Sequence, residues 1–173
     1  MLTVLLLSAQ VAVAVPSDTP PPTPAQRVRA VEVSEWYGRR LTLHRRLSYT
    51  VIPLFAFQYA AGQQIWEKGA AAPTWARRGH RIGAATIGTV FVVNTVTGAW
   101  NLWDSRQVEE GRTRRYLHAA SMLIADAGFT WAGAKLSEEA ERSLSKRRLH
   151  RTVALSSIAV SITSGLIMYF TND

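Results

Sequence analysis

The chain has 173 residues, enough for one domain of ordinary size or a small helical bundle. Hydrophobic residues make up 47% of it and charged residues only 18%, which excludes a disordered basic tail despite the net charge of +8. The absence of cysteine excludes a disulfide framework, a thiolate metal site and covalent attachment of a c-type haem. Apolar residues occur in long blocks and do not alternate with polar ones, so an all-β sandwich is not expected.

The N-terminal part has the composition of a signal-like segment followed by a linker. Residues 2–15 are apolar but short for a membrane span, and Ala12-Val13-Ala14 resembles a signal-peptide cleavage site, although no basic residue precedes it. We interpret residues 1–15 as a signal peptide or, alternatively, as an uncleaved short apolar segment. Residues 16–40 are predicted to form a Pro-rich linker and an interfacial segment, with a short helix lying on the membrane over residues 26–41.

Four later segments are almost free of charge, and each is close to the roughly 20 residues that a helix needs to cross a bilayer. They are residues 47–66, 82–103, 116–134 and 152–172, and Asp126 in the third is their only charged side chain. Arginines precede each segment, and Trp or Tyr residues lie near several of the ends, as is typical of membrane interfaces. The sequence thus predicts an all-α fold, a four-helix transmembrane up-down bundle over residues 41–173.

The positive charge is expected to contact anionic membrane lipid and not nucleic acid, because the aromatic residues lie at the span ends and not among the arginines. We expect a multi-pass protein of the bacterial inner membrane. The basic residues do not indicate its orientation, since alternating helices place ten of the 20 on each side. Only the signal-like N-terminus favours one orientation, with residues 15–46 outside the cytoplasm.

The sequence contains four histidines, and each lies at the N-terminal end of a different predicted span. In an up-down bundle, odd and even helices begin on opposite faces. His44 and His118 (the first pair) therefore share one face, and His80 and His150 (the second pair) share the other. The two helices of each pair are not consecutive and can lie diagonally across the bundle.

Two imidazoles that face each other suit the two axial positions of a haem iron, so we predict that all four histidines bind iron, with one haem per pair. Two alternatives remain open. The histidines could be solvated at the membrane interface without a ligand, or they could bind another metal, although two histidines without cysteine or a well-placed carboxylate are poor zinc or copper sites.

Glycines recur near the far end of each predicted span. Gly62 and Gly98 each follow the histidine of their own helix by 18 residues, or five turns, which is about 27 Å along the helix. Gly133 and Gly165 follow theirs by 15 residues. We expect these glycines to leave room for a haem in a crossed arrangement, with Gly62 near the haem of the second pair and Gly98 near the haem of the first.

Three arginines that directly follow a histidine are expected to meet haem propionates, although each alone is also a typical lipid anchor. They are Arg45, Arg81 and Arg151. Asp126 is interpreted either as a proton relay or quinone-supporting group, or as a protonated side chain hydrogen-bonded to a neighbouring helix. Gln58 and Asn94 are expected to form hydrogen bonds between helices.

These features resemble a known family. Four helices with one histidine each, together with the segments HRRLSYTVIPLFAFQYAAG (44–62) and LHRTVALSSIAVSITSG (149–165), are similar to the di-haem transmembrane core of the cytochrome b-561 family. The resemblance covers about residues 40–170 and implies two non-covalent haem b groups with electron transfer across the membrane between them. Members of that family often have six helices, whereas this chain has only the four core helices unless residues 2–15 act as a partial extra one.

The sequence therefore predicts a membrane di-haem b-type cytochrome, an electron-transport protein of the oxidoreductase type if haem is bound. Its electron donor and acceptor are expected to be a quinol, an ascorbate-like reductant or another redox protein, and membership of a larger membrane complex stays open. Two other functions are also left open: a non-redox membrane anchor or assembly subunit, and a small ion or metabolite carrier that uses Asp126.

Overall fold

The computed structural model describes residues 34–171, which are helical apart from short connections. Four long helices form the fold: α1 (Glu35–Lys68), α2 (Thr74–Asp104), α3 (Arg112–Trp131) and α5 (Leu144–Phe170). Shorter elements connect them, namely η1 (Gly69–Ala71), the π-helical turn η2 (Ala132–Leu136) and α4 (Ser137–Arg142). The predicted all-α fold with four main helices is confirmed for this part of the chain.

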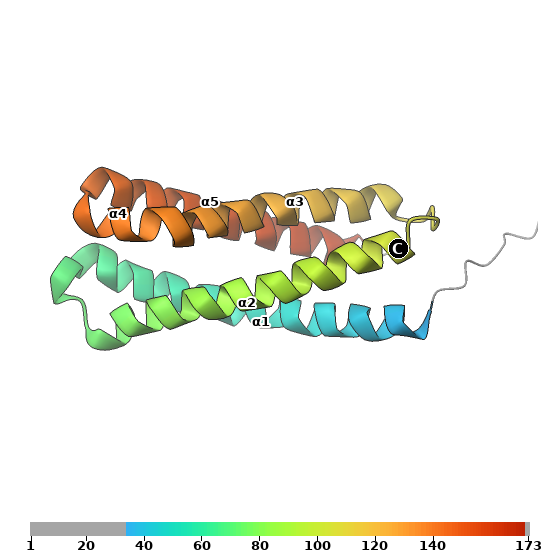
Figure 1. Ribbon diagram of the computed structural model, residues 1–173, viewed down its shortest axis with the longest axis horizontal. Helices are drawn as coiled ribbons and strands as arrows, with labels where there is room; N and C mark the ends of the chain where they lie inside the picture. Colours follow the sequence, from blue (N-terminus) through green and yellow to red (C-terminus); the bar gives the residue numbers. More distant parts are fainter. Residues whose placement is uncertain (1–33, 172–173) are drawn as a thin grey trace, which may run out of the picture. The chain divides into compact units, whose positions relative to one another are not determined.

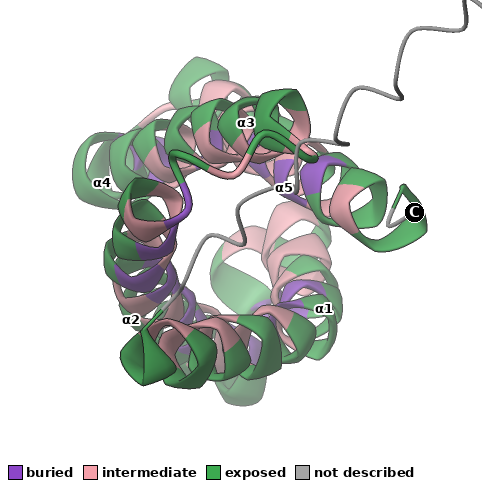
Figure 2. Cartoon of the chain, turned by 90° about the vertical axis from the view of Figure 1, so that its right-hand side faces the viewer, coloured by how far each residue is buried: buried purple, intermediate pink, exposed green. Residues whose placement is uncertain are grey.

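The four long helices pack as two antiparallel hairpins (Figure 1). α1 packs along α2 and α3 packs along α5, while α2 contacts α3 and, less extensively, α1 contacts α5. Seen along the bundle, the buried residues lie mostly on the inward sides of the helices (Figure 2). Among the described residues, α1 is therefore diagonal to α3, and α2 is diagonal to α5, as the sequence predicts for helices that carry paired histidines.

The first helix is longer at its N-terminal end than the sequence analysis expected. Ser34 caps α1, because its Oγ accepts a hydrogen bond of 3.3 Å from the backbone N–H of Tyr37. No proline interrupts the helix before Pro53, so residues 35–41 form its first turns and not part of a separate interfacial helix. The rest of that predicted segment, the signal-like segment and the Pro-rich linker lie outside the described residues.

Two glycines with positive φ shape the connections at opposite ends of the bundle. Gly69, with φ of 53°, follows α1 and donates its backbone N–H to the carbonyl oxygen of Ile65, which ends the helix. Gly111, with φ of 62°, precedes α3. A residue with a Cβ would be strained in either conformation, so the connection within the α1–α2 hairpin and the one that joins the two hairpins both favour glycine.

In the described part of the chain, several polar side chains are buried and many large hydrophobic ones are exposed. Its buried polar residues are small amide or hydroxyl side chains: Asn94, Thr97, Asn101, Ser105, Ser157, Ser161 and Ser164. Most of its buried hydrophobic residues are alanines, whereas 22 large hydrophobic side chains are exposed. An exposed apolar surface of this extent is typical of a face that contacts another molecule.

Two of the four helices, α2 and α5, are long and apolar enough to cross a membrane. α1 and α3 fall short of the same criterion. α1 carries Gln58, Gln63 and Gln64 in its second half, and α3 begins with three arginines in four residues and includes Asp126.

Three phenylalanine rings fill the middle of the bundle. Phe55 of α1, Phe91 of α2 and Phe129 of α3 have ring centres 5.0–6.0 Å apart. Each ring follows the histidine of its own helix by 11 residues, so the cluster lies between the two ends of the bundle at which the histidines are found. Val51, Ile87 and Ala125 complete the buried cluster.

Removing one of these rings should destabilise the fold. Phe91 is 5% exposed, and we expect Phe91→Ala to lower the free energy of unfolding by about 3–5 kcal/mol because it leaves a cavity. The matched control is Phe170→Ala, at a site that is 74% exposed, which should change the stability by less than about 0.5 kcal/mol. Chemical denaturation of the purified protein measures both values, and equal losses would contradict the assigned core.

Candidate functional site

The four histidines form two pairs at opposite ends of the bundle. The ring centres of His44 and His118 are 6.3 Å apart and their planes are inclined by 80°. The ring centres of His80 and His150 are 6.2 Å apart, with planes inclined by 64°. These are the first and second pairs that the helix topology predicts, and each joins two diagonal helices.

α1 and α2 each carry a glycine that lies against the histidine of the other helix. A Cβ added to Gly98 would lie 3.1 Å from Cε1 of His44, and one added to Gly62 would lie 3.3 Å from Cε1 of His80. This is the crossed arrangement expected from the sequence, but the group that each glycine contacts is the imidazole ring itself. A Cβ on Gly133 or Gly165 would meet no atom within 4 Å, so these two glycines do not contact a histidine.

Acceptors from the neighbouring helix engage both Nδ1 atoms of the first pair. Nδ1 of His44 lies 3.1 Å from the backbone oxygen of Asn94 and 3.2 Å from Oγ1 of Thr97. Nδ1 of His118 lies 2.8 Å from Oγ of Ser164. A proton on Nδ1 donates to these acceptors, which fixes the orientation of each ring and leaves Nε2 as the nitrogen with a free lone pair.

The second pair has fewer such contacts. Nδ1 of His150 lies 3.0 Å from the backbone oxygen of Ala132, the first residue of the π-helical turn η2. Nδ1 of His80 is buried and has no hydrogen-bond partner among the described residues, and Gly62 lies against its ring. π-helical turns are frequent at functional sites, and this one begins at the residue that orients a histidine.

One position in each helix supplies the contact to the neighbouring histidine. The residue 14 positions after each histidine reaches the histidine of the antiparallel partner helix, through side chain or backbone. These residues are Gln58, Asn94, Ala132 and Ser164. Sequence analysis missed the roles of Thr97, Ala132 and Ser164 towards the rings, although the shared spacing was a usable signal.

The predicted interhelical hydrogen bonds of two amide side chains are confirmed. Nε2 of Gln58 donates to the backbone oxygen of His80 at 2.8 Å, and Nδ2 of Asn94 donates to Oγ of Ser48 at 3.1 Å. Both bonds join α1 to α2. They hold the hairpin in the register that brings each glycine against its histidine.

The three arginines that were expected to meet propionates lie at the two ends of the bundle. Arg45 and Arg81 are exposed beside their histidines, and none of the three forms an ion pair within the described residues. Arg151 places its guanidinium 5.0 Å from the ring centre of Trp66. Their positions are compatible with binding either a carboxylate of a cofactor or a lipid headgroup.

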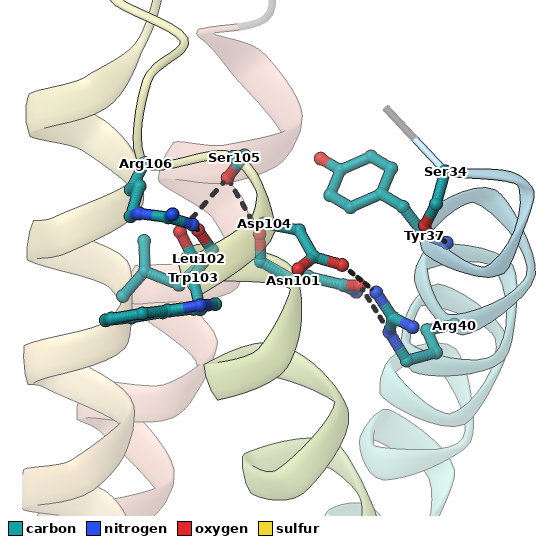
Figure 3. Close-up of polar contacts among 9 residues, drawn as sticks. All are labelled: Ser34, Tyr37, Arg40, Asn101, Leu102, Trp103, Asp104, Ser105 and Arg106. Atoms are coloured by element: carbon teal, nitrogen blue, oxygen red, sulfur yellow. Dashed lines mark hydrogen bonds and ion pairs between the residues drawn. The ribbon is translucent and has the colours of Figure 1, made fainter. Parts of the chain in front are cut away.

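A partly buried ion pair lies one helical turn outside the first pair (Figure 3). Arg40, four residues before His44, pairs with Asp104 and donates from Nε to Oδ1 of Asn101 at 3.3 Å. Its guanidinium also lies 4.8 Å from the ring centre of Trp100. These contacts join the start of α1 to the end of α2. Sequence analysis assigned no role to Arg40 and missed these contacts.

Asp126 contacts the neighbouring hairpin near the middle of the bundle. The hydroxyl of Thr95 in α2 donates to its Oδ2, while Oδ1 is buried without a hydrogen-bond partner among the described residues. The contact is the kind of interhelical hydrogen bond that the sequence analysis kept as one of two interpretations of this residue.

The surroundings of His44 favour its neutral form. Burial lowers the pKa of His44 below its ordinary value, the hydrogen bond to the Asn94 backbone opposes this, and the charge of Arg45 adds to it. A neutral imidazole is the form that binds a metal. Among residues 34–171, no group of three or more histidine or acidic side chains could hold a metal ion, so a multidentate zinc-type site is absent from this part of the chain.

No protein-family model matches the chain, and neither a curated protein nor a solved structure does. The function must therefore be argued from the paired histidines themselves.

The lowered pKa of His44 predicts a pH dependence of stability. The unfolded chain takes up a proton at this histidine near the ordinary value of 6.5, at pH values where the folded chain still holds it neutral. Above this value His44 is neutral in both states and the folded chain keeps its full stability. As the pH falls below it, the unfolded chain takes up the proton more readily, and the free energy of unfolding decreases. We expect the free energy of unfolding of the haem-free protein to fall on acidification more steeply than that of His44→Gln. Parallel pH profiles of the two proteins would contradict the neutral, buried state of His44.

Proposed function

We propose that the chain is an integral membrane di-haem b-type cytochrome that passes electrons between two haems at opposite faces of the membrane. His44 and His118 would bind the iron of one haem, and His80 and His150 the iron of the other. The haems would be held without covalent bonds, since the sequence has no cysteine.

The separation of the imidazole rings carries this proposal. An imidazole nitrogen lies about 2.0 Å from a bound transition metal. In a five-membered ring with bonds of about 1.33 Å, each nitrogen lies about 1.1 Å from the ring centre. Two imidazoles on opposite sides of one metal therefore have ring centres about 6.2 Å apart by these distances. The observed values are 6.3 Å and 6.2 Å, so both pairs have the spacing of two axial ligands.

The hydrogen bonds and the number of ligands support the same chemistry. Nδ1 is the engaged nitrogen of His44, His118 and His150, which leaves Nε2 to bind iron. Iron with two axial histidines has no open coordination position. When bound, such a haem supplies a one-electron couple, which suits electron transfer and not the binding of a substrate to the metal.

The distribution of side chains supports a membrane location for the whole bundle. Its interior is lined by small polar residues and its exterior by large apolar ones, as expected where lipid replaces water around the helices. Exposed tryptophans mark both ends, with Trp100 and Trp103 at the end of the first pair and Trp75 and Trp131 at the other. All four long helices would cross the membrane, including the more polar α1 and α3, in which Gln58 and Asp126 form hydrogen bonds with α2.

The partners follow from this proposal. Arg45, Arg81 and Arg151 would bind haem propionates or lipid headgroups at the two faces. The electron donor and acceptor would be a quinol, an ascorbate-like reductant or another redox protein, in a bacterial inner membrane. The chain would also be a candidate subunit of a larger membrane complex.

Haem content tests the proposal. The full chain, purified from haem-sufficient cells, should contain two haems per chain and give a reduced-minus-oxidised spectrum of b-type haem. His44→Ala and His118→Ala should each leave one haem, with the same spectrum in both variants, and the double variant should lose no more. A folded protein without haem would instead favour a non-redox anchor, and loss of different haems by the two variants would contradict the pairing.

A glycine substitution tests the crossed arrangement. Leu at position 62 presses on the ring of His80, an overpacking cost of typically about 1–3 kcal/mol. Gly62→Leu should therefore lower the occupancy of the second pair's haem and keep that of the first. The control is Gly88→Leu, because a Cβ at Gly88 meets nothing within 4 Å. If Gly62→Leu disturbs only the haem of the first pair, the crossed arrangement is wrong.

A further inference from the structure

The two histidine pairs differ at positions that are otherwise equivalent. Thr97 in α2 and Ala61 in α1 each follow the histidine of their own helix by 17 residues. Ser164 in α5 and Ala132 at the end of α3 each follow theirs by 14 residues. In each comparison the residue with a hydroxyl, Thr97 or Ser164, lies against a histidine of the first pair. The alanine occupies the equivalent position at the second pair.

Both hydroxyls are placed to accept a hydrogen bond from an imidazole. Oγ1 of Thr97 donates its own proton to the backbone oxygen of Val93 at 2.8 Å, so its lone pairs face Nδ1 of His44 at 3.2 Å. Oγ of Ser164 lies 2.8 Å from Nδ1 of His118. Thr97 and Ser164 are both buried, and water does not compete for these contacts.

The second pair lacks hydroxyls at the corresponding positions. Ala61 and Ala132 are 0% and 3% exposed and carry no polar side-chain atom. Nδ1 of His150 lies against a backbone oxygen, and no hydroxyl lies within hydrogen-bond distance of Nδ1 of His150 or His80 among the described residues. The second pair therefore lacks the hydroxyl acceptors that the first pair has.

Hydrogen bonding at Nδ1 changes the iron that Nε2 binds. An acceptor at Nδ1–H makes the imidazole a more basic ligand, which stabilises Fe(III) relative to Fe(II) and lowers the reduction potential. We propose, on the basis of the function proposed above, that Thr97 and Ser164 are positioning residues that give the first pair's iron the lower reduction potential, so that electrons pass from the first pair to the second.

The transfer balances without a proton or a bond change. With both haems bound, one electron would pass from ferrous iron held by His44 and His118 to ferric iron held by His80 and His150, so that the first would be oxidised and the second reduced. A reductant of the quinol or ascorbate class restores the first iron. The end of the bundle that carries Arg40 and His44 is thus the electron-entry end.

A redox titration of the purified, haem-loaded full chain, followed by optical absorbance, tests this assignment. Wild type should give two separate one-electron steps, and His118→Ala should remove the step at lower potential. Ser164→Ala should move the lower step to higher potential and leave the upper step in place, while Ser164→Thr should restore the wild-type value. Thr97→Val should shift the same step in the same direction and so provides a second test if Ser164→Ala does not fold.

The matched control is Ser161→Ala. Ser161 is a buried serine of the same helix, but its hydroxyl donates to the backbone oxygen of Ile158 at 3.0 Å, so its loss should move neither step. A single step in wild type, loss of the upper step in His118→Ala, or an unchanged lower step in both Ser164→Ala and Thr97→Val would each overturn the proposal. A folded protein without haem would overturn the proposed function instead.

Discussion

Two imidazole rings held about 6 Å apart across a bundle diagonal impose a strict constraint on every helix around them. Each histidine must lie at the correct end of its helix, and its ring must face the centre of the bundle. The residue of the neighbouring helix that lies against the ring must be small enough to leave room for it. Gly98 satisfies the last condition for His44, and Gly62 satisfies it for His80. The 18-residue offset between histidine and glycine works in both directions only because α1 and α2 are antiparallel and in a fixed register.

Polar contacts within the hairpin hold that register. Gln58 and Asn94 bond across the α1–α2 interface, and Arg40 joins the start of α1 to Asp104 at the end of α2. These contacts lie between the helices and are only partly exposed, so water competes with them less than it would at the surface. The polar interior therefore serves both to orient the histidines and to hold the helices together, while the phenylalanine cluster separates the two ends.

Much of this arrangement could be predicted from the sequence. Gaps between charges located the four helices, and alternation of their direction paired His44 with His118 and His80 with His150. The spacing of Gly62 and Gly98 predicted the end of the bundle that each would approach, because position along a straight helix follows from residue number alone. It did not predict that the contacting group would be an imidazole ring. Membrane crossing by all four helices does not follow from the same pattern, because only α2 and α5 are both long and apolar enough to span a bilayer.

The contacts that sequence analysis missed depend on rotation and local backbone geometry. Whether Ser164 points at His118 depends on how α5 is rotated about its own axis. The hydrophobic periodicity of a sequence gives this rotation only approximately, because the apolar face of a helix is about 100° wide. The acceptor for His150 is a backbone oxygen in a π-helical turn at Ala132, and no side chain signals such a turn. The Arg40–Asp104 pair was missed because each residue alone resembles an ordinary interfacial charge.

Electron paramagnetic resonance of the oxidised, purified protein tests the central claim most directly, because the spin state of ferric iron reports its axial ligands. Two strong-field imidazoles on each iron make it low-spin. The account predicts low-spin ferric signals that together correspond to two irons per chain, with no high-spin signal. High-spin iron as the main species, or a folded protein without iron, would contradict it.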